Sequence, residues 1–309
     1  MKKIGELPGI SDIPEGSVLV INTNDGTKKI SFGDLCQAVK TALDIPTVVQ
    51  SIEITESGNI PDGPVIKESF DAINDLLLEA ATYSYGKEIT MSWAELSAKI
   101  KTEDFSGLHI GDYKDIVLST GEEVRVDLSG FNTYMNVGDS DILTDPHLYF
   151  TFRDCLKTTY QMNSSNTNTG GYASSALAKT VNTTIYNTLP ADLRAVMKEV
   201  RRLDNNKGGW AWASRKLWLL QETEVFGRNN WSDGFEGGGI QLPIFAHSYR
   251  HIVKGLGKGA AASGSRTVWW LASPVASNIT YFCYVNTTGF ADSGVASRSI
   301  GVAPGFIIA

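Results

Sequence analysis

The chain of 309 residues is 42% apolar and 20% charged, which is the composition of a globular protein with a sizeable core. Its net charge of −7 disfavours nucleic acid or an anionic membrane as a partner. No apolar run approaches the roughly 18 residues of a membrane-spanning helix, and residues 1–16 lack the apolar core of a secretory signal.

Residues 1–45 predict a small unit made of a β-hairpin and one helix. The apolar run at 18–22 is typical of a strand, and Asn-Asp-Gly at 24–26 is a hairpin turn signal. Ser31 can cap a following helix whose apolar residues recur every four positions. Because so small a unit buries little apolar surface, we expect it to attach or oligomerise the chain by docking on a partner.

Residues 46–86 predict a linker and then an amphipathic helix. Prolines and polar turns fill the first part, and apolar residues then recur with helical spacing at Ile66, Phe70, Ile73 and Leu77. This helix can pack against copies of itself in an oligomer or against its own domain, and the sequence leaves both open.

From residue 87 onward the pattern is that of a mixed α+β domain, 87–309. The spacing of Trp93, Leu96 and Ile100 predicts a short helix. Residues 109–132 predict two strands joined by a turn at 120–121.

Later segments of this domain also predict both helices and strands. Leu177, Val181 and Ile185 predict one helix. Pro190 opens another, which we expect to carry apolar residues at 193, 196, 197 and 200 on one face. Residues 216–220 predict a buried strand. The glycine-rich loop at 227–239 lacks the spacing of a phosphate-binding loop.

Two pairs of carboxylates are the candidates for acid-base chemistry. Glu222 and Glu224 would share one face of a strand, and Asp112 and Asp115 would meet on a helical turn. Either pair could form a glycosidase couple, but carboxylates this close are usually solvated surface groups. Since no nucleophile-elbow or zinc-protease motif is present, we expect no catalytic residue and no enzymatic activity.

Cysteine and histidine positions do not predict a metal site. Cys36, Cys155 and Cys283 are far apart and are expected to be buried thiols. His247 and His251 have a spacing that could hold a metal on a helix, but no glutamate lies between them, and ordinary histidines are the alternative. We therefore expect no metal and no cofactor.

The last 39 residues, which follow Trp270, contain no Lys, Glu, Gln, Met or Trp. These five types cannot arise when the adenines of asparagine AAC and AAT codons are randomised, whereas nearly every type present can. A loop-rich and strand-rich surface segment would also be poor in Lys and Glu, so composition alone leaves two explanations.

Several sequence blocks in order resemble a family found in phages and Firmicutes. WWLASP at 269–274, FCYV at 282–285 and GVAPGF at 301–306 resemble its C-terminal signature, and the segments at 159–196 and 216–227 resemble its central blocks. That family is similar to the C-type-lectin-like fold of formylglycine-generating enzymes, which the variable proteins of diversity-generating retroelements share, among them the phage major tropism determinant. The resemblance covers 87–309.

The chain departs from the family pattern at two arginines and at a cysteine pair. Ala272 and Ala303 stand where relatives carry arginine, so any ion pair made there is absent. The catalytic cysteine pair of formylglycine-generating enzymes has no counterpart in Cys155 and Cys283, so enzymatic activity does not carry over.

The resemblance implies a rigid frame that displays a variable face. The frame would be anchored by apolar residues between the variable stretches, namely Trp269, Trp270, Pro274, Phe282, Pro304 and Phe306. Val285 is a further apolar anchor of this kind. The face would bind ligand through Asn278, Tyr281, Tyr284, Asn286, Thr288, Phe290, Asp292, Ser293, Gly294, Val295, Arg298 and Ile300.

The implied function is that of a bacteriophage receptor-binding protein in a head or tail fibre, on the virion surface. The C-terminal domain would bind a host surface protein or glycan, and the N-terminal unit would contact other virion proteins, with a homotrimer as the expected assembly. Two alternatives are a structural decoration protein without a specific receptor and a bacterial cell-surface carbohydrate-binding protein.

Overall fold

The computed structural model describes residues 19–23, 26–30, 86–233, 240–247 and 249–309. The chain divides into two compact units, Met1–Phe70 and Asp71–Ala309, and each is described by itself. In the first unit, β1 (Leu19–Thr23) and β2 (Gly26–Ile30) pair antiparallel, with Leu19 opposite Ile30. This confirms the predicted hairpin. The expected helices after Ser31 and around Phe70 lie outside the described residues.

The described part of the second unit starts with a capped helix and a hairpin, both as predicted. In α3 (Trp93–Ile100), Ser92 and Glu95 form a capping box, and one face of the helix is buried. β3 (Tyr113–Val117) and β4 (Glu123–Phe131) pair antiparallel. The hydrophobic spacing predicted α3 and the turn at 120–121 predicted the β3–β4 hairpin, because both elements depend on interactions between residues close in sequence.

The main sheet is antiparallel and has the order β3-β4-β5-β13-β6, with β9 also paired to β13. It adds β5 (Leu148–Phe152), β6 (Met197–Lys198), β9 (Trp218–Leu219) and the C-terminal β13 (Pro304–Ile308). All residues of β5 and β13 are buried. The last strand therefore lies inside the sheet, and Ser97 Oγ donates to the Ala309 carbonyl at 2.8 Å, which joins α3 to the C-terminal residue.

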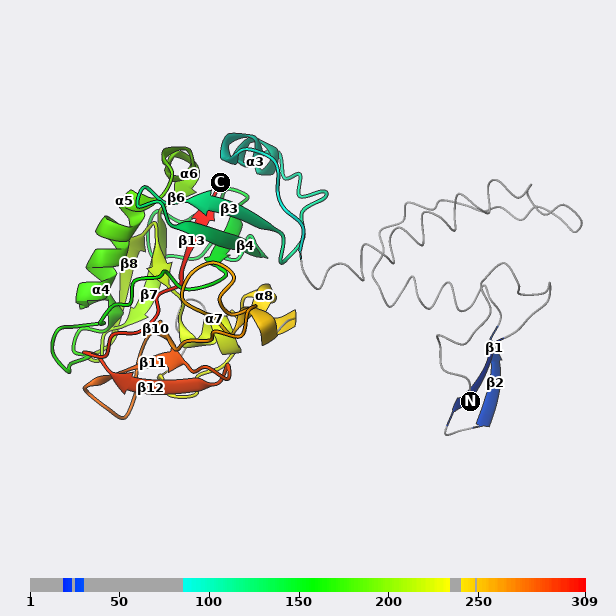
Figure 1. The fold of residues 1–309 in the computed structure, drawn as a ribbon. Helices are drawn as coiled ribbons and strands as arrows, with labels where there is room; N and C mark the ends of the chain where they lie inside the picture. The colour runs from blue at the N-terminus through cyan, green and yellow to red at the C-terminus, as the bar shows by residue number, and fades with distance from the viewer. Residues whose placement is uncertain (1–18, 24–25, 31–85, 234–239, 248) are drawn as a thin grey trace, which may run out of the picture. The chain divides into compact units, whose positions relative to one another are not determined.

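A helical stretch lies beside β7 (Val200–Asn205) and β8 (Trp210–Arg215) (Figure 1), and its middle part contacts β9 of the main sheet. It runs through η3 (Tyr172–Ser174), α4 (Ala176–Thr180), the π-helical η4 (Val181–Ile185) and α5 (Tyr186–Thr188). The residues predicted to form its apolar face, Leu177, Val181 and Ile185, are all buried.

The helix predicted to follow Pro190 is shorter than expected. α6 (Ala191–Val196) ends where the chain turns into β6, and Met197 pairs with Ile308 of the last strand. Val200 then begins β7 (Val200–Asn205), which pairs with β8 (Trp210–Arg215). The helical spacing of residues 193–200 was misleading because pairing with a distant strand outweighed local preference.

A second sheet, of three strands, forms the other end of the unit. Its order is β10 (Trp269–Pro274), β11 (Tyr281–Val285) and β12 (Ala291–Val295), all antiparallel. Short helices α7 (Glu222–Phe226), α8 (Pro243–His247) and η5 (Tyr249–His251) lie between the sheets in the sequence. The unit is thus a mixed α+β domain. Its described part holds no helix that is long and apolar enough to span a membrane.

Candidate functional site

The expected anchors of the C-terminal segment, Val285 among them, are all buried. The ring N–H groups of two tryptophans also have hydrogen-bond acceptors. Trp269 Nε1 donates to the Ile252 carbonyl at 3.0 Å, and Trp270 Nε1 donates to the Tyr160 carbonyl at 2.9 Å. A buried indole without such an acceptor would be costly. Both rings are therefore fixed in position and direction in the core around β10, on the two faces of that strand.

The turn between β11 and β12 is organised by one side chain. Asn286 Oδ1 accepts hydrogen bonds from the Thr288 amide, the Thr288 hydroxyl and the Phe290 amide, at 2.7 to 3.0 Å. Gly289, with φ of +82°, supplies the left-handed residue that the turn needs. Asn286 thus holds the backbone, and Phe290 projects from a fixed turn with 66% of its surface exposed.

The loop between β10 and β11 is held from below by residues of other segments. The fully buried Asn168 donates to the carbonyls of Asn278 and Tyr281, at 2.7 and 2.8 Å. Lys207 Nζ donates to the carbonyls of Val275 and Ala276. The backbone of this loop is thereby fixed, while Ile279 at its tip is 73% exposed.

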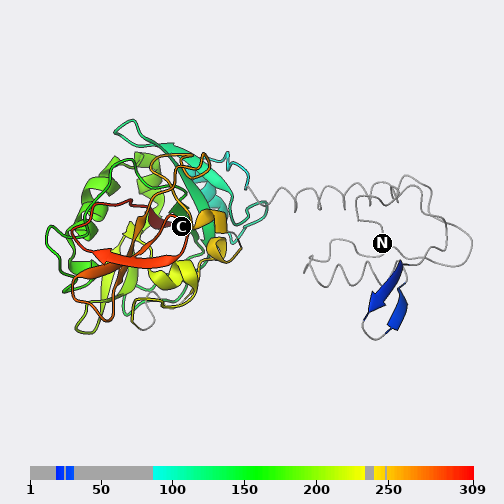
Figure 2. The same cartoon turned by 60° about the horizontal axis from the view of Figure 1, so that its bottom comes forward.

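A third large apolar side chain reaches the same sheet from the loop after α7. Trp231 is 45% exposed, and its Nε1 donates to the Ala291 carbonyl at the start of β12, at 3.2 Å. β12 is the edge strand of the sheet, and Figure 2 shows it running across the front of this end of the unit. We call Trp231, Ile279, Phe290 and β12 the hairpin face.

The predicted ligand residues divide into three groups by exposure. Thr288, Phe290 and Arg298 are exposed. Half-buried are Asn278, Tyr281, Asn286, Asp292, Ser293 and Val295. Gly294 and Ile300 are buried, as is Tyr284, which is 7% exposed.

The buried residues correct the expected outward-facing set. Ile300 exchanges two backbone hydrogen bonds with Tyr160, which turns its side chain inward. Gly294 lies under the Tyr284 ring, so that a Cβ there would be 3.0 Å from the ring. Neither position can present a side chain to a ligand.

Tyr284 forms a small polar cluster at the rim of the face. Its hydroxyl donates to Asp292 Oδ2 at 3.0 Å and accepts from Arg298 Nη1 at 3.3 Å, and its ring packs edge-on against Trp270. Burial, and then the bond to Asp292, raise the pKa of Tyr284. The only two charged residues of the last 39 are therefore bound to the same hydroxyl.

The asparagine-rich segment at 161–175 borders the same face, which the sequence did not indicate. Asn166 Oδ1 accepts from the amide and hydroxyl of Ser297, at 3.2 and 2.6 Å, and Gln161 Nε2 donates to the Ser297 carbonyl. Trp231 was missed for the same reason, since both contacts join segments far apart in the chain. The many asparagines at 161–175 are the only sequence feature that could have pointed to a surface role for this segment.

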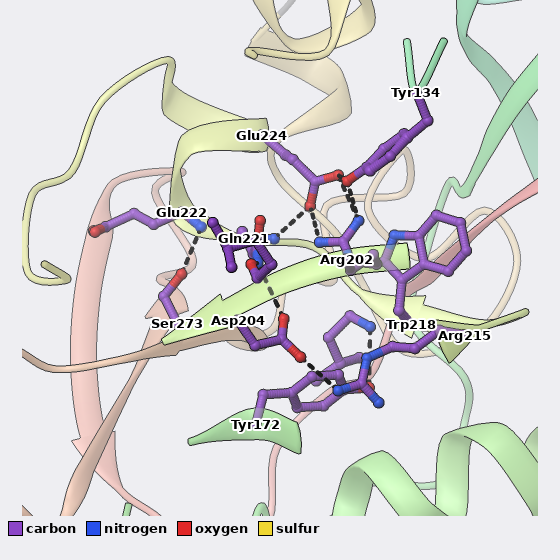
Figure 3. A network of polar contacts seen from close by, with 12 residues as sticks. Tyr134, Tyr172, Arg202, Asp204, Arg215, Trp218, Gln221, Glu222, Glu224 and Ser273 are labelled. Carbon is purple, nitrogen blue, oxygen red and sulfur yellow. Dashed lines mark hydrogen bonds and ion pairs between the residues drawn. The ribbon is translucent and has the colours of Figure 1, made fainter. Parts of the chain in front are cut away.

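Beneath the face lies a network of buried charges (Figure 3). Glu224 and Arg202 form a bidentate ion pair, with bonds of 3.0 and 2.8 Å, and both side chains are almost fully buried. Glu224 also accepts from the hydroxyls of Tyr134 and Tyr149 and from the Gln221 amide. Burial raises the pKa of both tyrosines, so they stay protonated and donate to the carboxylate.

A second buried pair joins β7 to β8. Arg215 Nη2 donates to Asp204 Oδ2 at 2.5 Å, and Gln221 Nε2 donates to Asp204 Oδ1 at 3.1 Å. The Arg215 guanidinium lies 4.9 Å from the centre of the Tyr172 ring, and burial raises the pKa of Tyr172 to about 12. The two ion pairs tie β7 and β8 to α7.

Glu222 fixes the loop that carries Trp231. This fully buried carboxylate accepts from the amides of Trp231 and Ser232 and from the Ser232 hydroxyl, and its own amide donates to Ser273 Oγ. The expectation of a solvated strand pair was wrong, because α7 is a helix and each of Glu222 and Glu224 has its own buried partners.

The aspartate pair does not form either. Asp112 accepts from the amides of Lys87 and His109, whereas Asp115 lies on β3 and pairs with Arg125 and Lys258. Since Asp115 is in a strand, the helical turn that would have brought them together is absent.

Cysteines and histidines do not gather either. Cys155 and Cys283 are free and buried, as predicted, and Cys36 lies outside the described residues. His251 Nδ1 lies 3.2 Å from Asp127 Oδ2, and nothing is described of the His247 side chain. In the described part of the chain, no three His, Cys, Asp or Glu side chains form a group that could hold a metal.

Comparison with known proteins gives one match. A family model described as a domain of unknown function, DUF6273, matches residues 145–309, from just before β5 to the C-terminus. No curated protein and no solved structure matches the chain. Since the matched region exceeds half of the chain and contains the whole hairpin face, the chain belongs to the DUF6273 family.

Proposed function

We propose that the chain is a bacteriophage receptor-binding protein whose hairpin face binds a protein or glycan on the host surface. The observation that carries the proposal is the exposure of Phe290, Ile279 and Trp231 on backbone fixed from below. Exposed apolar side chains that lie together are typical of interaction sites, and Trp231 reaches the carbonyl of the residue next to Phe290. No catalytic step is part of this function.

The surroundings of these three side chains suit a recognition surface. Thr288, Ser293 and Asn286 supply small polar groups beside them, and such a mixture of rigid aromatics and adaptable hydrogen-bonding residues is typical of paratopes. The depletion of Lys, Glu, Gln, Met and Trp after Trp270 supports adenine-directed diversification by a retroelement. The host-binding side chains of the hairpin face would then vary, while the buried frame would stay constant.

The proposed fold of this domain is C-type-lectin-like. The central position of β13, the contact of Ser97 in α3 with the C-terminal Ala309, and a second small sheet inserted between β5 and β13 are compatible with it. The N-terminal unit would join the chain to other virion proteins, as a homotrimer on the virion surface. Several copies of the face would then bind with avidity.

The test uses the labelled full-length chain and a panel of Firmicutes cells. We expect saturable binding to some strains, and loss of most of it in Phe290→Ser/Ile279→Ser. The matched control is Val117→Ser/Ile142→Ser, which changes two exposed apolar side chains outside the hairpin face, at 59% and 46% exposure. Unchanged binding by the first variant, or equal loss in both, would overturn the proposal.

The DNA that flanks the gene distinguishes this function from a decoration protein and from a bacterial carbohydrate-binding protein. A reverse transcriptase gene and a near-copy of the 3′ end that differs only at adenines are expected. A decoration protein or a bacterial carbohydrate-binding protein would have no such template.

A further inference from the structure

A large cavity lies away from the hairpin face, where three segments of the second unit meet. It has a volume of about 980 Å³ and is lined by residues of the β3–β4 hairpin, of the chain after β5, and of the loop at 250–266. Figure 1 shows β3 and β4 at the opposite end of the unit from β11 and β12. The volume is at the upper end of the roughly 300–1,000 Å³ typical of small-molecule sites.

Its lining is strongly basic for this protein. Residues 86–309 contain 21 basic and 21 acidic residues, so this part has no net charge of its own. The lining nevertheless includes six of the basic residues, Arg125, Arg153, Lys157, Arg250, Lys258 and Arg266, and only two of the acidic ones, Glu123 and Asp154. Positive charge is therefore concentrated at one place.

Part of this charge is neutralised within the protein. Arg125 forms a bidentate pair with Asp115, and Lys258 pairs with Asp115 and Glu123. Arg153 Nε donates to Asp127, a buried residue that also faces His251. These pairs fix the wall of the cavity.

Two other cations of the lining form no ion pair among the described residues. In the described ranges, Lys157 and Arg266 form no ion pair with a carboxylate. Arg153 Nη2 is buried and has no hydrogen-bond acceptor there. Because this atom is buried, it does not face the open cavity, and Arg153 contributes its positive charge to the lining through the fixed wall.

Asp154 accepts no hydrogen bond from these donors. Its carboxylate accepts from the amides of Gly255, Gly259 and Ala261, at 2.8 to 3.3 Å, and so shapes the loop at 255–261. Its lone pairs are directed into that loop. The cavity thus combines a fixed wall with uncommitted cations.

We propose that this cavity binds a phosphate-bearing oligoanion, with Lys157 and Arg266 as its donors and the charge of Arg153 beside them. Planar guanidinium groups and lysine ammonium groups together are the donors that proteins use for phosphate. The inference does not rest on the function proposed for the hairpin face, since the two sites share no residue.

The experiment measures binding of inorganic tripolyphosphate to the full-length chain by calorimetry at about 0.1 M ionic strength, where the Debye length is roughly 10 Å. We expect saturable binding at one site. Lys157→Gln/Arg266→Gln should weaken it roughly tenfold or more, since each charge-assisted hydrogen bond accounts for about a factor of ten. Both side chains are exposed, so this variant is expected to fold.

The matched control is Lys101→Gln/Arg228→Gln, which removes the same charge from two exposed positions outside the cavity. Its affinity should change less than about twofold. Equal weakening in both variants would show general charge attraction, and absence of saturable binding by the unaltered chain would also overturn the proposal.

Two probes distinguish the sources of phosphate. Tripolyphosphate presents closely spaced charges, whereas a glycerol phosphate oligomer presents one charge per repeat. Tighter binding of the first supports a compact phosphate ester, and tighter binding of the second supports a phosphodiester polymer. Cell binding through the hairpin face should be unchanged in Lys157→Gln/Arg266→Gln, which keeps a failure of either proposal separate from the other.

Discussion

The buried frame and the hairpin face use polar residues in opposite ways. The frame places Glu222, Glu224 and Asp204 in the interior with dedicated partners. The face, by contrast, exposes Phe290 and Ile279 to water, and its strands come from a segment with one aspartate and one arginine. Buried ion pairs therefore fix the geometry of the frame, whereas the hairpin face offers exposed apolar side chains for recognition. Substitutions should accordingly have large effects on stability in the frame and small ones on the face.

The largest effect is expected from Glu224→Gln. This change leaves the buried Arg202 without its counter-charge, and breaking such a pair costs about 3–5 kcal/mol of unfolding free energy. Denaturant unfolding measures it. Arg201→Gln is the control, because its pair with Asp139 is partly exposed and should contribute about 1 kcal/mol or less. Similar losses in both variants would contradict the special role of the buried pair.

A second test concerns a buried cation of the frame. Lys254 Nζ donates to the carbonyls of Phe152 and Arg153, and burial lowers its pKa from 10.5 to about 8. Between these two pH values the unfolded chain binds the proton that the folded chain has released, so stability rises with pH.

Lys254→Met removes this titration. We expect the stability of the unaltered chain, relative to the variant, to increase by about 3 kcal/mol between pH 8 and 10.5. Chemical unfolding at a series of pH values measures the difference. Parallel stability curves would show that Lys254 titrates as it does in the unfolded chain.

A smaller effect is expected at the boundary between frame and face. Asn286→Ala removes three hydrogen bonds from the β11–β12 turn and should cost about 1–2 kcal/mol. Thr287→Ala, at the exposed neighbouring position, should change stability by less than about 0.5 kcal/mol. Thermal unfolding compares the two, and equal melting temperatures would mean that the turn forms without Asn286.

The smallest effect is expected on the face itself. Phe290→Ser should change the unfolding free energy by less than about 0.5 kcal/mol, because the side chain is mostly in water in the folded state too. A loss above about 2 kcal/mol would place Phe290 in the core and would remove the contrast between frame and face.

Three of the failed predictions share one cause. The residues at 193–200 have helical spacing, but Met197 and Val200 enter strands that pair with distant segments. Glu222 and Glu224 resembled solvated neighbours, yet each lies among partners from elsewhere in the chain. Ile300 and Gly294 resembled exposed loop residues until the Tyr160 backbone and the Tyr284 ring covered them. In each of these cases the deciding contact is with another segment of the chain, 9 to 10 residues away for Glu222 and Gly294 and farther for the others.

The sequence by itself determined the local elements and the composition of the C-terminal segment. The capping box before Trp93, the turn between β3 and β4, and the burial of Trp269 and Trp270 follow from spacing and residue type. Only the tertiary structure decided which side chains face water, that Tyr134 reaches a carboxylate 90 residues away, and that three segments form one basic cavity. The physical reason is that hydrophobic periodicity acts over a few residues, whereas burial and charge pairing depend on which distant segments the fold brings together.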